Sequence, residues 1–559
     1  MIGQILAAMM LIPAAAPAPA IADDPYDVLV FSKTAGFRHD SIPAGIQTVR
    51  DLGAANGFTV TATEDAGAFT AANLANYEAV VFMSTTGDVL NAGQQTAFES
   101  YIRGGGGYVG VHAAADTEYD WPFYGELVGA WFNSHPAIQQ ATVRTEDRGH
   151  AATAHLPQAW NRTDEWYNYR TNPRSTAHVL STLDESTYSG GGMGADHPIT
   201  WCKTLTGGRS FYTGLGHTQE SYADPLFRQE LLGGIRYAAK QANADCRPET
   251  GYTAIYNGST AGWSQAGPGS FTNTDATLTS TGGMGLFWYQ AKQYTSYSLK
   301  LDWKMAGDDN SGVFIGFPPS TDPWSAVDNG YEIQIDPTDA NDRTTGSVYT
   351  FKSADLAARD AALNPAGEWN AYELLVEGER LQIFLNGVKI NDFTNTNPVR
   401  SLAGHIGLQN HGTGDDVSFR NVRIKELGGT TPPTGVGPIV GLANKCLDVD
   451  GGKTADGTKI QLYTCNNSSA QSWTRTGNTF RALGKCLDIS GGASADGTKV
   501  QLYTCNNSGA QNWTPQSNGT IVNPQSGKCL DVSENNPADR QQIHIWTCTA
   551  AANQIWRLP

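Results

Sequence analysis

Charged residues are scarce in this sequence, because Asp, Glu, Lys and Arg make up only 16% of its 559 residues. Basic side chains are the fewest, with 37 Lys and Arg against 54 Asp and Glu, and the formal net charge is -17. Nucleic acid and anionic membranes repel such a chain, so we expect neither as a partner. A neutral oligo- or polysaccharide is compatible with this charge.

Long apolar runs are also absent, since no segment after the N-terminus approaches the roughly 18 residues of a membrane span. Residues 1–22 combine an apolar run with an Ala/Pro stretch that ends in Ala20-Ile21-Ala22, the small-x-small pattern that signal peptidase cleaves. The basic residues of an ordinary signal-peptide start are missing. We predict a signal peptide over 1–22 and a secreted, extracellular protein; a disordered Ala/Pro tail is the alternative.

The eight cysteines include no Cys-x-x-Cys pair, which leaves a zinc ribbon or a thioredoxin-type site unsupported. Six of them form three pairs, each 19 residues apart: Cys446 and Cys465, Cys486 and Cys505, Cys529 and Cys548. This repeated spacing predicts three disulfides and an oxidising compartment. The other two, Cys202 and Cys246, could pair with each other.

A chain of this length divides into about three or four domains. In residues 23–247, apolar runs such as Val28–Phe31 and Tyr108–Val111 alternate with helical stretches such as Ser41–Asn56 and Asn91–Arg103. This pattern predicts a parallel sheet covered by helices on both faces. In such sheets ligands bind at the carboxyl ends of the strands.

Residues 250–427 change to a period of two, and Tyr297–Met305 is predicted as a half-buried strand. Asn386-Gly387 between two apolar runs predicts a tight hairpin. Many short strands and no convincing helix predict a β-sandwich of the jelly-roll kind. A Gly/Thr/Pro-rich linker at 428–436 follows.

The last segment, 437–559, contains an internal repeat. Lys-Cys-Leu-Asp occurs at 445–448, 485–488 and 528–531, and Gln-x-Trp occurs at 471–473, 511–513 and 554–556. Units of about 40 residues cannot bury a core alone, so we expect them to close on one another with threefold pseudosymmetry. The repeats resemble the ricin-B-type β-trefoil lectins, which implies binding of oligo- or polysaccharide.

Each repeat offers the groups that bind a sugar: a carboxylate for hydroxyls, an aromatic platform for the C–H face, and an amide. The positions that match the family are Asp448, Tyr463, Asn466 and Gln471; Asp488, Tyr503, Asn506 and Gln511; and Asp531, Trp546, Asn553 and Gln554. We expect each Gln to back its pocket and each Trp to serve the core. The third repeat departs most, with Trp in place of Tyr and Thr549 where the others have Asn. The alternative is that some repeats are scaffold only.

Six segments of the first domain resemble the trehalose-utilisation (ThuA-like) family. They are Val30–His39, Gly110–Asp116, Ser134–Pro136, Asp164–Tyr167, His197–Ile199 and Thr213–Glu220. The resemblance implies a flavodoxin-like fold related to class I glutamine amidotransferases, whose nucleophilic Cys lies on a tight turn after a strand. Here that turn carries His112, with neither Cys nor Ser, so glutaminase activity is excluded.

Eight of the 11 histidines lie in this domain. His39, His112, His135 and His217 follow or border predicted strands, so several could converge at one edge of the sheet. We predict a divalent metal site formed by His39, His112 and His217, completed by Asp116 or Glu220, or a general acid/base on a sugar. The alternative is that these histidines hold loops by hydrogen bonds, which we favour for His150, His155 and His178.

Residues 250–427 resemble the 3-keto-disaccharide hydrolase family, a concanavalin-like jelly roll. The matching segments are Asn310–Phe314, Gly330–Asp336, Thr345–Tyr349, Gly367–Asn370, Phe384–Gly387, Gly407–Gly412 and Phe419–Val422. The resemblance implies action on glycosides oxidised at C3. The family's Arg after Asn-Ser-Gly is replaced by Ile315-Gly316-Phe317, so a substrate contact is missing here.

A ketone at C3 acidifies the C2 proton, so a base can abstract it while the anomeric substituent leaves; water is added later. This elimination requires a carboxylate or imidazole base and a group that polarises the ketone. Glu332, Gln334 and Asp336 alternate on one strand and share a face. We predict Glu332 or His411 as the base, with Gln334 and Arg420 orienting the substrate. The alternative is a non-catalytic sugar-binding jelly roll.

These observations predict a secreted carbohydrate-active hydrolase or lyase that acts on glycosides or 3-keto-glycosides and is held on polysaccharide by its lectin domain. Two alternatives remain open: a non-catalytic multidomain sugar-binding protein, and an enzyme whose catalysis lies only in the ThuA-like domain.

Overall fold

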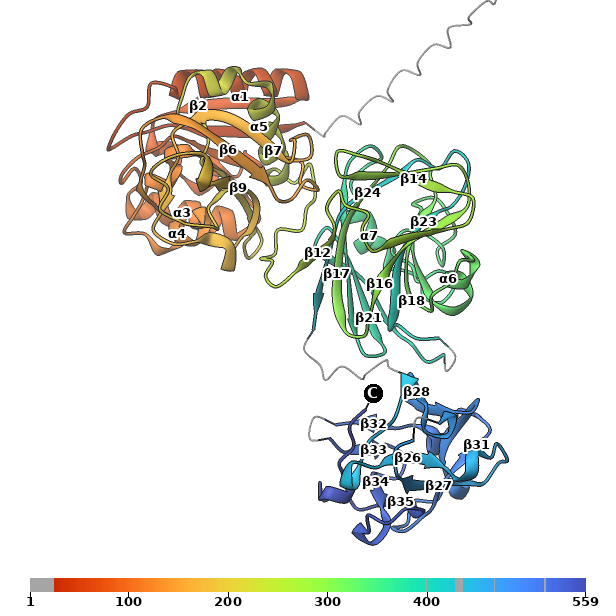
Figure 1. Cartoon of the computed structure of the whole chain (residues 1–559). Helices are drawn as coiled ribbons and strands as arrows, with labels where there is room; N and C mark the ends of the chain where they lie inside the picture. Colours follow the sequence, from red (N-terminus) through yellow and green to blue (C-terminus); the bar gives the residue numbers. More distant parts are fainter. Residues whose placement is uncertain (1–24, 398–399, 428–435, 467, 517–518, 559) are drawn as a thin grey trace, which may run out of the picture. The chain divides into compact units, whose positions relative to one another are not determined.

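The computed structural model describes residues 25–397, 400–427, 436–466, 468–516 and 519–558 (Figure 1). The predicted signal peptide and almost all of the predicted linker lie outside these residues. Among the described residues, no helix has the length and apolar character needed to cross a membrane.

The first domain is built on a nine-stranded sheet with the strand order β2-β1-β3-β4-β11-β10-β9-β6-β7. The strands are β1 (Tyr26–Phe31), β2 (Phe58–Thr63), β3 (Ala79–Met83), β4 (Gly107–Val111), β6 (Gln139–Thr145), β7 (Ala159–Asp164), β9 (His178–Asp184), β10 (Pro198–Thr204) and β11 (Arg209–Thr213). A separate pair is formed by β5 (Phe132–Ser134) and β8 (Asn168–Tyr169).

The prediction of a parallel sheet holds for only part of it. β2, β1, β3, β4 and β11 run parallel, whereas β11, β10, β9, β6 and β7 pair antiparallel. The connection from β10 to β11 explains part of the error: it spans only Leu205–Gly208, and a parallel pair needs a crossover of a dozen or more residues.

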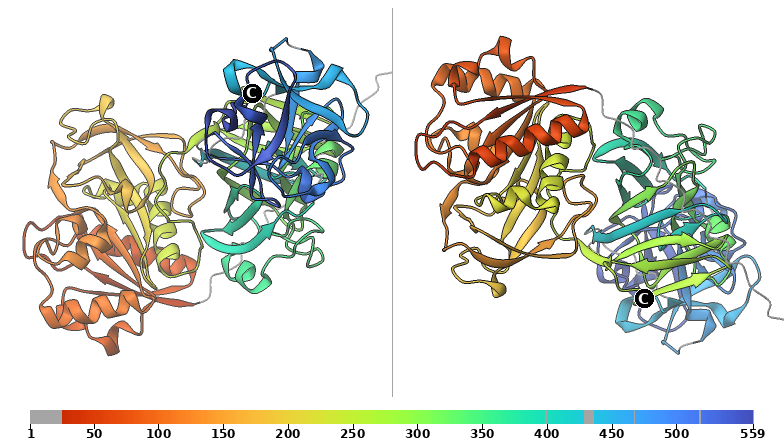
Figure 2. Two further views of the ribbon diagram at one scale, coloured as in Figure 1. Left: turned by 90° about the horizontal axis from the view of Figure 1, so that it is seen from below. Right: turned by 90° about the horizontal axis from the view of Figure 1, so that it is seen from above.

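Helices cover both faces of this sheet (Figures 1 and 2). They are α1 (Ile42–Asn56), α2 (Ala71–Leu74), α3 (Ala92–Arg103), α4 (Pro122–Val128) and α5 (Pro225–Ala238). Helix α3 begins with a capping box, in which Asn91 and Gln94 satisfy each other's backbone N–H groups. Strand residues such as Val30, Val81 and Phe211 are fully buried between the helical layers.

The second domain is a sandwich of two antiparallel sheets. One has the order β14-β15-β24-β17-β20-β21-β22 with β12 beside β24, and the other has the order β13-β16-β23-β18-β19. The strands are β12 (Thr253–Tyr256), β13 (Trp263–Ala266), β14 (Ser270–Thr274), β15 (Thr277–Thr281), β16 (Gly285–Tyr294), β17 (Tyr297–Met305), β18 (Ser311–Phe317), β19 (Tyr331–Ile335), β20 (Asn370–Glu377), β21 (Arg380–Leu385), β22 (Val388–Thr394), β23 (Gly404–Asn410) and β24 (Val417–Glu426).

Two predictions for this domain were wrong in detail. β17 has the predicted bounds but is buried on both faces, because it lies in the middle of its sheet and its outward residues Lys300 and Asp302 are covered. Two short helices are present, α6 (Trp324–Asn329) and α7 (Leu356–Ala362), each too short to show a helical period. The Asn386-Gly387 hairpin is confirmed, with φ of 48° and 83° at its two residues.

The third domain is a β-trefoil. Its strands are β25 (Val436–Gly437), β26 (Cys446–Val449), β27 (Thr458–Tyr463), β28 (Trp473–Thr476), β29 (Thr479–Ala482), β30 (Lys485–Ile489), β31 (Val500–Tyr503), β32 (Thr514–Pro515), β33 (Ile521–Asn523), β34 (Lys528–Val532) and β35 (Gln541–Trp546). The three Gln-x-Trp tryptophans lie in its core, and the three predicted disulfides are formed, as is Cys202–Cys246 in the first domain.

Equivalent aspartates join the successive repeats into a ring. Asp456 pairs with Lys485 at 2.5 Å, Asp496 with Lys528 at 2.9 Å, and Asp539 with Lys445 at 2.6 Å. Each lysine opens the next Lys-Cys-Leu-Asp segment, and each carboxylate also accepts a hydrogen bond from a threonine N–H of that repeat. The loop of one repeat is thereby anchored to the strands of the next.

Candidate functional site

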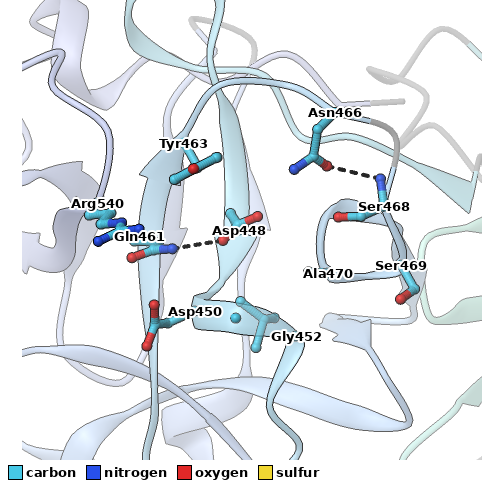
Figure 3. A pocket seen from close by; sticks show the side chains of 12 residues that line it. Asp448, Asp450, Gly452, Gln461, Tyr463, Asn466, Ser468, Ser469, Ala470 and Arg540 are labelled. Atoms are coloured by element: carbon cyan, nitrogen blue, oxygen red, sulfur yellow. Dashed lines mark hydrogen bonds between the residues drawn. The ribbon is translucent and has the colours of Figure 1, made fainter.

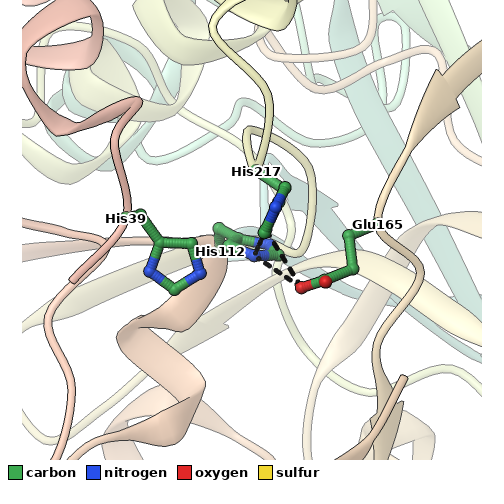
Figure 4. A group of neighbouring side chains, drawn as sticks. All are labelled: His39, His112, Glu165 and His217. Atoms are coloured by element: carbon green, nitrogen blue, oxygen red, sulfur yellow. Dashed lines mark hydrogen bonds and ion pairs between the residues drawn. The ribbon is translucent and has the colours of Figure 1, made fainter. Parts of the chain in front are cut away.

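Three histidines and one glutamate meet at the edge of the first sheet where its parallel strands end (Figure 4). His39 lies in the loop after β1, His112 directly follows β4, and His217 follows β11. Glu165 directly follows β7. One side-chain ligand atom from each residue lies within 4.8 Å of the other three, so the four form one cluster, called here the histidine cluster.

The three imidazoles of the cluster face a common point. The ring centroids of His39, His112 and His217 are 5.0 Å apart in every pair, and the planes are nearly perpendicular, at 78° to 88°. The Nε2 of His112 lies 3.1 Å from the Nδ1 of His217. A carboxylate oxygen of Glu165 lies 3.0 Å from that Nδ1 and 3.4 Å from the Nε2 of His112.

His112 is oriented by its backbone and by a hydrogen bond. Its φ is +50°, a left-handed conformation at the turn from β4 into a 3-10 helix, η2 (His112–Asp116). Its Nδ1–H donates to the carbonyl of Gly214 at 3.0 Å, which leaves Nε2 as the atom that faces the cluster. A hydrogen bond of this kind fixes the tautomer of metal-binding histidines.

Asp164 lies outside the histidine cluster but positions two of its members, His217 and Glu165. It is fully buried, and its carboxylate accepts from the backbone N–H groups of Gly216 and His217 at 2.9 and 3.0 Å. The guanidinium of Arg162 donates to the same carboxylate at 2.9 Å. The loop that carries His217 is therefore tied to the end of β7, next to Glu165.

The electrostatics of the cluster favour a neutral imidazole at His39 and an ionised carboxylate at Glu165, whereas at His217 burial is outweighed by the hydrogen bond and charge of Glu165, which raise the pKa of that ring. Burial, together with the neighbouring His112 and His217, lowers the pKa of His39 to about 3. Burial opposes ionisation of Glu165, but its close contacts with the rings of His112 and His217 outweigh burial and lower the pKa of this carboxyl. Neutral imidazole and carboxylate are the protonation states in which these residues bind a metal.

A divalent ion fits these donors. Zinc bonds of about 2.0–2.1 Å in tetrahedral geometry place neighbouring ligand atoms about 3.3 Å apart. The three contacts among His112, His217 and Glu165 measure 3.0 to 3.4 Å. The Nδ1 of His39 is buried without a hydrogen-bond partner among the described residues. Three imidazoles and a carboxylate are ligands that suit zinc.

The carboxylates predicted for this site lie elsewhere. Asp116 accepts a hydrogen bond from the hydroxyl of Tyr119, and Glu220 is exposed at the start of a 3-10 helix, η5 (Glu220–Ala223). Glu165 occupies the place predicted for them, and His135 stands beside it, with 3.0 Å between Nδ1 and a carboxylate oxygen. The segment Asp164–Tyr167, which resembles the ThuA-like family, was the one sequence signal for Glu165.

The histidines predicted to hold loops make hydrogen bonds of that kind. The Nδ1 of His150 accepts from the backbone N–H of Ala152, and the Nε2 of His155 donates to the carbonyl of Leu226. His178 contacts the carboxylate of Asp147 at 2.6 Å.

In the second domain, Glu332 and Gln334 point to the same side of β19, which pairs with β18. Gly312 on β18 leaves room for Glu332, since a Cβ there would lie 2.5 Å from its Oε1. Burial raises the pKa of Glu332 to about 8, although a hydrogen bond from Gln409 opposes this. Both amide atoms of Gln334 and the Oε1 of Gln409 are buried without a hydrogen-bond partner among the described residues.

The other residues predicted for this site are not gathered with Glu332. Arg420 lies opposite Asp302 on β24, which belongs to the other sheet. The side chain of His411 is 50% exposed and contacts Asp415 at 2.9 Å. Asp336 accepts from backbone N–H groups of the following turn, so its carboxylate holds a loop.

The first two trefoil pockets share one hydrogen-bond pattern. In the first, Asp448 accepts from Gln461 at 2.9 Å and from Gln471 at 3.0 Å (Figure 3). The second repeats this pattern with Asp488, Gln501 and Gln511 at 2.8 and 2.9 Å. Tyr463 lines the first pocket together with Asp448, and Tyr503 ends the equivalent strand β31. The side chains of Asn466 and Asn506 cap the turns that follow.

The third pocket has different chemistry. Asp531 accepts from His544 and Gln554, both at 2.8 Å, and from Asn553 at 2.9 Å. Trp546 is 43% exposed and stacks on His544, with 5.4 Å between ring centroids. Gln461, Gln501 and His544 were missed in the sequence, although each lies 13 residues after its aspartate.

Three family models match the chain in succession. Residues 27–238 match the trehalose utilisation (ThuA) family, residues 251–425 match the 3-keto-alpha-glucoside-1,2-lyase-like domain, and residues 435–556 match the ricin-type beta-trefoil lectin domain. The chain therefore has a glycosyl hydrolase-like and carbohydrate-binding architecture. Its three parts are a ThuA domain, a 3-keto-disaccharide hydrolase domain and a ricin B lectin domain, as the sequence resemblances predicted.

Solved structures are similar to each part. A ThuA-like protein from Bacteroides uniformis is 22% identical, with 40% of this chain and 95% of that chain covered and a TM-score of 0.35. A protein assigned as a glycosyl hydrolase from Parabacteroides distasonis is 23% identical, with 32% and 100% covered and a TM-score of 0.28. A non-toxic homologue of type II RIPs from Momordica charantia, in complex with alpha-methyl-D-galactoside, is 34% identical, with 22% and 46% covered and a TM-score of 0.21.

Proposed function

We propose that this chain is an exported enzyme that cleaves glycosides or 3-keto-glycosides and is held on polysaccharide by its trefoil. The observation that carries the proposal is the histidine cluster, in which three imidazoles and Glu165 converge in a domain of the trehalose-utilisation family. Four disulfides and a lectin domain are consistent with an extracellular protein.

We infer that His39, His112, His217 and Glu165 hold a divalent metal ion. Such an ion, when bound, supplies Lewis acidity toward a sugar carbonyl or hydroxyl oxygen. His135 lies at the rim with its side chain 42% exposed and its Nδ1 3.0 Å from a carboxylate oxygen of Glu165, so it can exchange a proton with a substrate hydroxyl. The protein orients the donors in advance through Asp164 and Gly214.

An exposed aromatic ring beside the cluster supports a sugar as the substrate. Phe37 is 68% exposed, and its ring lies 5.0 Å from that of His39. Its backbone is held in place, because Thr86 donates a hydrogen bond to the Phe37 carbonyl at 2.8 Å. An exposed ring on an anchored backbone offers a platform for the C–H face of a sugar.

The buried carboxyl of the second domain is a second candidate centre. The family match and the raised pKa of Glu332 favour it, as do the buried amide atoms of Gln334 and the Oε1 of Gln409, which have no hydrogen-bond partner among the described residues. In its ionised form Glu332 could take the C2 proton of a 3-keto-glycoside, so that the C1–oxygen bond breaks, a C1–C2 double bond forms and the leaving alcohol takes up a proton. Gln334 and Gln409 would then hydrogen-bond the sugar.

One experiment tests the proposal and separates the two centres. Full-length protein is incubated with native and C3-oxidised disaccharides, with and without chelator, and sugar consumption is followed by chromatography. If the cluster is catalytic, chelator and His112→Ala lower the rate at least 100-fold, whereas His155→Ala, a histidine of the same domain outside the cluster, does not.

If Glu332 is catalytic, Glu332→Gln gives the loss and the exposed Glu377→Gln does not. If the wild-type protein consumed neither sugar, the proposed enzymatic function would be refuted, and the alternative of a non-catalytic sugar-binding protein would stand.

A further inference from the structure

One charged residue sets the first trefoil pocket apart from the other two. This pocket, a cavity of about 350 Å³, is lined by Asp448, Gln461 and Tyr463 of the first repeat and by Arg540 of the third. Figure 3 shows Arg540 beside Gln461 and Tyr463 at one side of the pocket. A side chain from one repeat therefore lines the pocket of another.

The other two pockets have glycine at the equivalent position. The backbone N–H of Arg540 donates to Leu462 in β27, as those of Gly457 and Gly497 donate to the matching residues of β31 and β35. A Cβ on Gly457 would lie 3.9 Å from Gln501, and one on Gly497 would lie 3.7 Å from Trp546. Each of these positions therefore borders the next pocket, but only Arg540 extends a side chain there.

The backbone at Arg540 is held beside the first pocket. Its φ is +68°, a left-handed conformation that glycine adopts freely and arginine does not. The carbonyl of Arg540 accepts from the Nζ of Lys459 at 2.6 Å, and the preceding Asp539 pairs with Lys445. Both anchors belong to the first repeat, so the backbone of Arg540 is fixed beside the first pocket.

In the part of the chain that the structure describes, no acidic group pairs with Arg540. Among the described residues, no ion pair or hydrogen bond engages its guanidinium, whereas the other charges of the pocket are engaged. Asp450 pairs with Lys453 at 3.2 Å. Asp448 accepts from two glutamine amides.

We propose that the first trefoil pocket binds an acidic sugar, one whose ring carries a carboxylate, and that Arg540 is its partner. A guanidinium presents two parallel N–H groups that match the two oxygens of a carboxylate. The second and third pockets, which have glycine at this position, take neutral sugars. The inference rests on the proposed role of the trefoil in binding polysaccharide.

The test compares galacturonic acid with galactose, which differ at C6, by calorimetry on the full-length protein. The background variant carries Asp488→Asn and Asp531→Asn, so that the first pocket is measured alone. We expect the uronate to bind at least 10-fold more tightly than galactose in this background, with a ratio that falls as salt is raised. Arg540→Gly restores the residue of the other repeats and should bring the ratio to one or below, and Arg540→Lys should reduce it in part.

The converse variant transfers the property. Gly457→Arg, in a background with Asp448→Asn and Asp531→Asn, should give the second pocket a preference for the uronate. Equal affinity for both sugars in the first pocket, or a ratio that Arg540→Gly leaves unchanged, would overturn the inference while neutral binding still upholds the lectin role. Absence of binding to either sugar by the wild-type protein would overturn both.

Discussion

The buried carboxyl of Glu332 makes the stability of the second domain depend on pH in a specific way. Its pKa is raised from 4.5 to about 8 because burial disfavours the ionised form. The stabilisation of the protonated form is complete below pH 4.5 and is lost as the pH rises through 8. At about 1.4 kcal/mol per tenfold change in an equilibrium constant, the loss is about 3 kcal/mol at pH 7 and about 5 kcal/mol at pH 9.

Glu332→Gln removes this ionisation while it keeps the size of the side chain. The variant should therefore gain about 5 kcal/mol relative to the wild-type protein between pH 4.5 and pH 9 in the free energy of opening of β18 and β19. Hydrogen–deuterium exchange of peptides from these strands measures this quantity in the full-length chain, after correction for the intrinsic effect of pH on exchange. Glu377→Gln, at an exposed position, is the control, since its free energy of opening should depend on pH as that of the wild-type protein does. If Glu332→Gln also showed the pH dependence of the wild-type protein, Glu332 would ionise as readily in the folded as in the unfolded chain, and the proposed effect of its burial would be refuted.

Three further predictions concern the other domains. Replacing the three pocket aspartates of the trefoil with asparagine should abolish retention on polysaccharide columns; undiminished retention would contradict the sugar-binding role. Each trefoil disulfide should stabilise the domain by about 3 kcal/mol in the chain-entropy model. Peptide mapping under non-reducing conditions should find no free thiols at these six cysteines, and free thiols there would count against export. Metal bound by the histidine cluster should be released as the pH falls below about 6.5, because Glu165 outweighs burial and raises the pKa of His217, and a proton on this ring competes with the metal. Metal content that stays constant down to pH 5 would argue against His217 as a ligand.

The sequence predicted those members of the histidine cluster whose position follows from the end of a parallel strand. His39, His112 and His217 each follow a strand of the parallel half of the sheet, and parallel strands end at one edge. Glu165 follows β7, which is four strands away from β11 in the sheet, and only the three-dimensional course of the chain brings Asp164 to the loop of His217. Proximity in sequence favoured Asp116, but the turn of η2 directs its carboxylate to Tyr119.

The β domains show a similar limit. Alternation on one strand was sufficient to place Glu332 and Gln334 on one side of β19. It could not show that Arg420 belongs to the other sheet, because sheet membership is set by pairing between distant strands. In the trefoil, repetition revealed the pockets, but the third repeat differs: Asn553, which aligns with Ala470 and Ala510, reaches its aspartate from a different position.

The backbone at His112 joins the fold to the proposed function. A residue with a side chain held at φ of +50° costs about 1 to 3 kcal/mol, which the surrounding structure must offset. Here the offset is visible: Tyr212 donates a hydrogen bond to the His112 carbonyl at 2.9 Å, and the ring is fully buried against Tyr167. Packing alone would be satisfied by glycine, which adopts this conformation without strain. An imidazole that is strained, buried and directed at two other imidazoles is therefore better explained by the metal-binding role proposed for it than by the stability that it contributes.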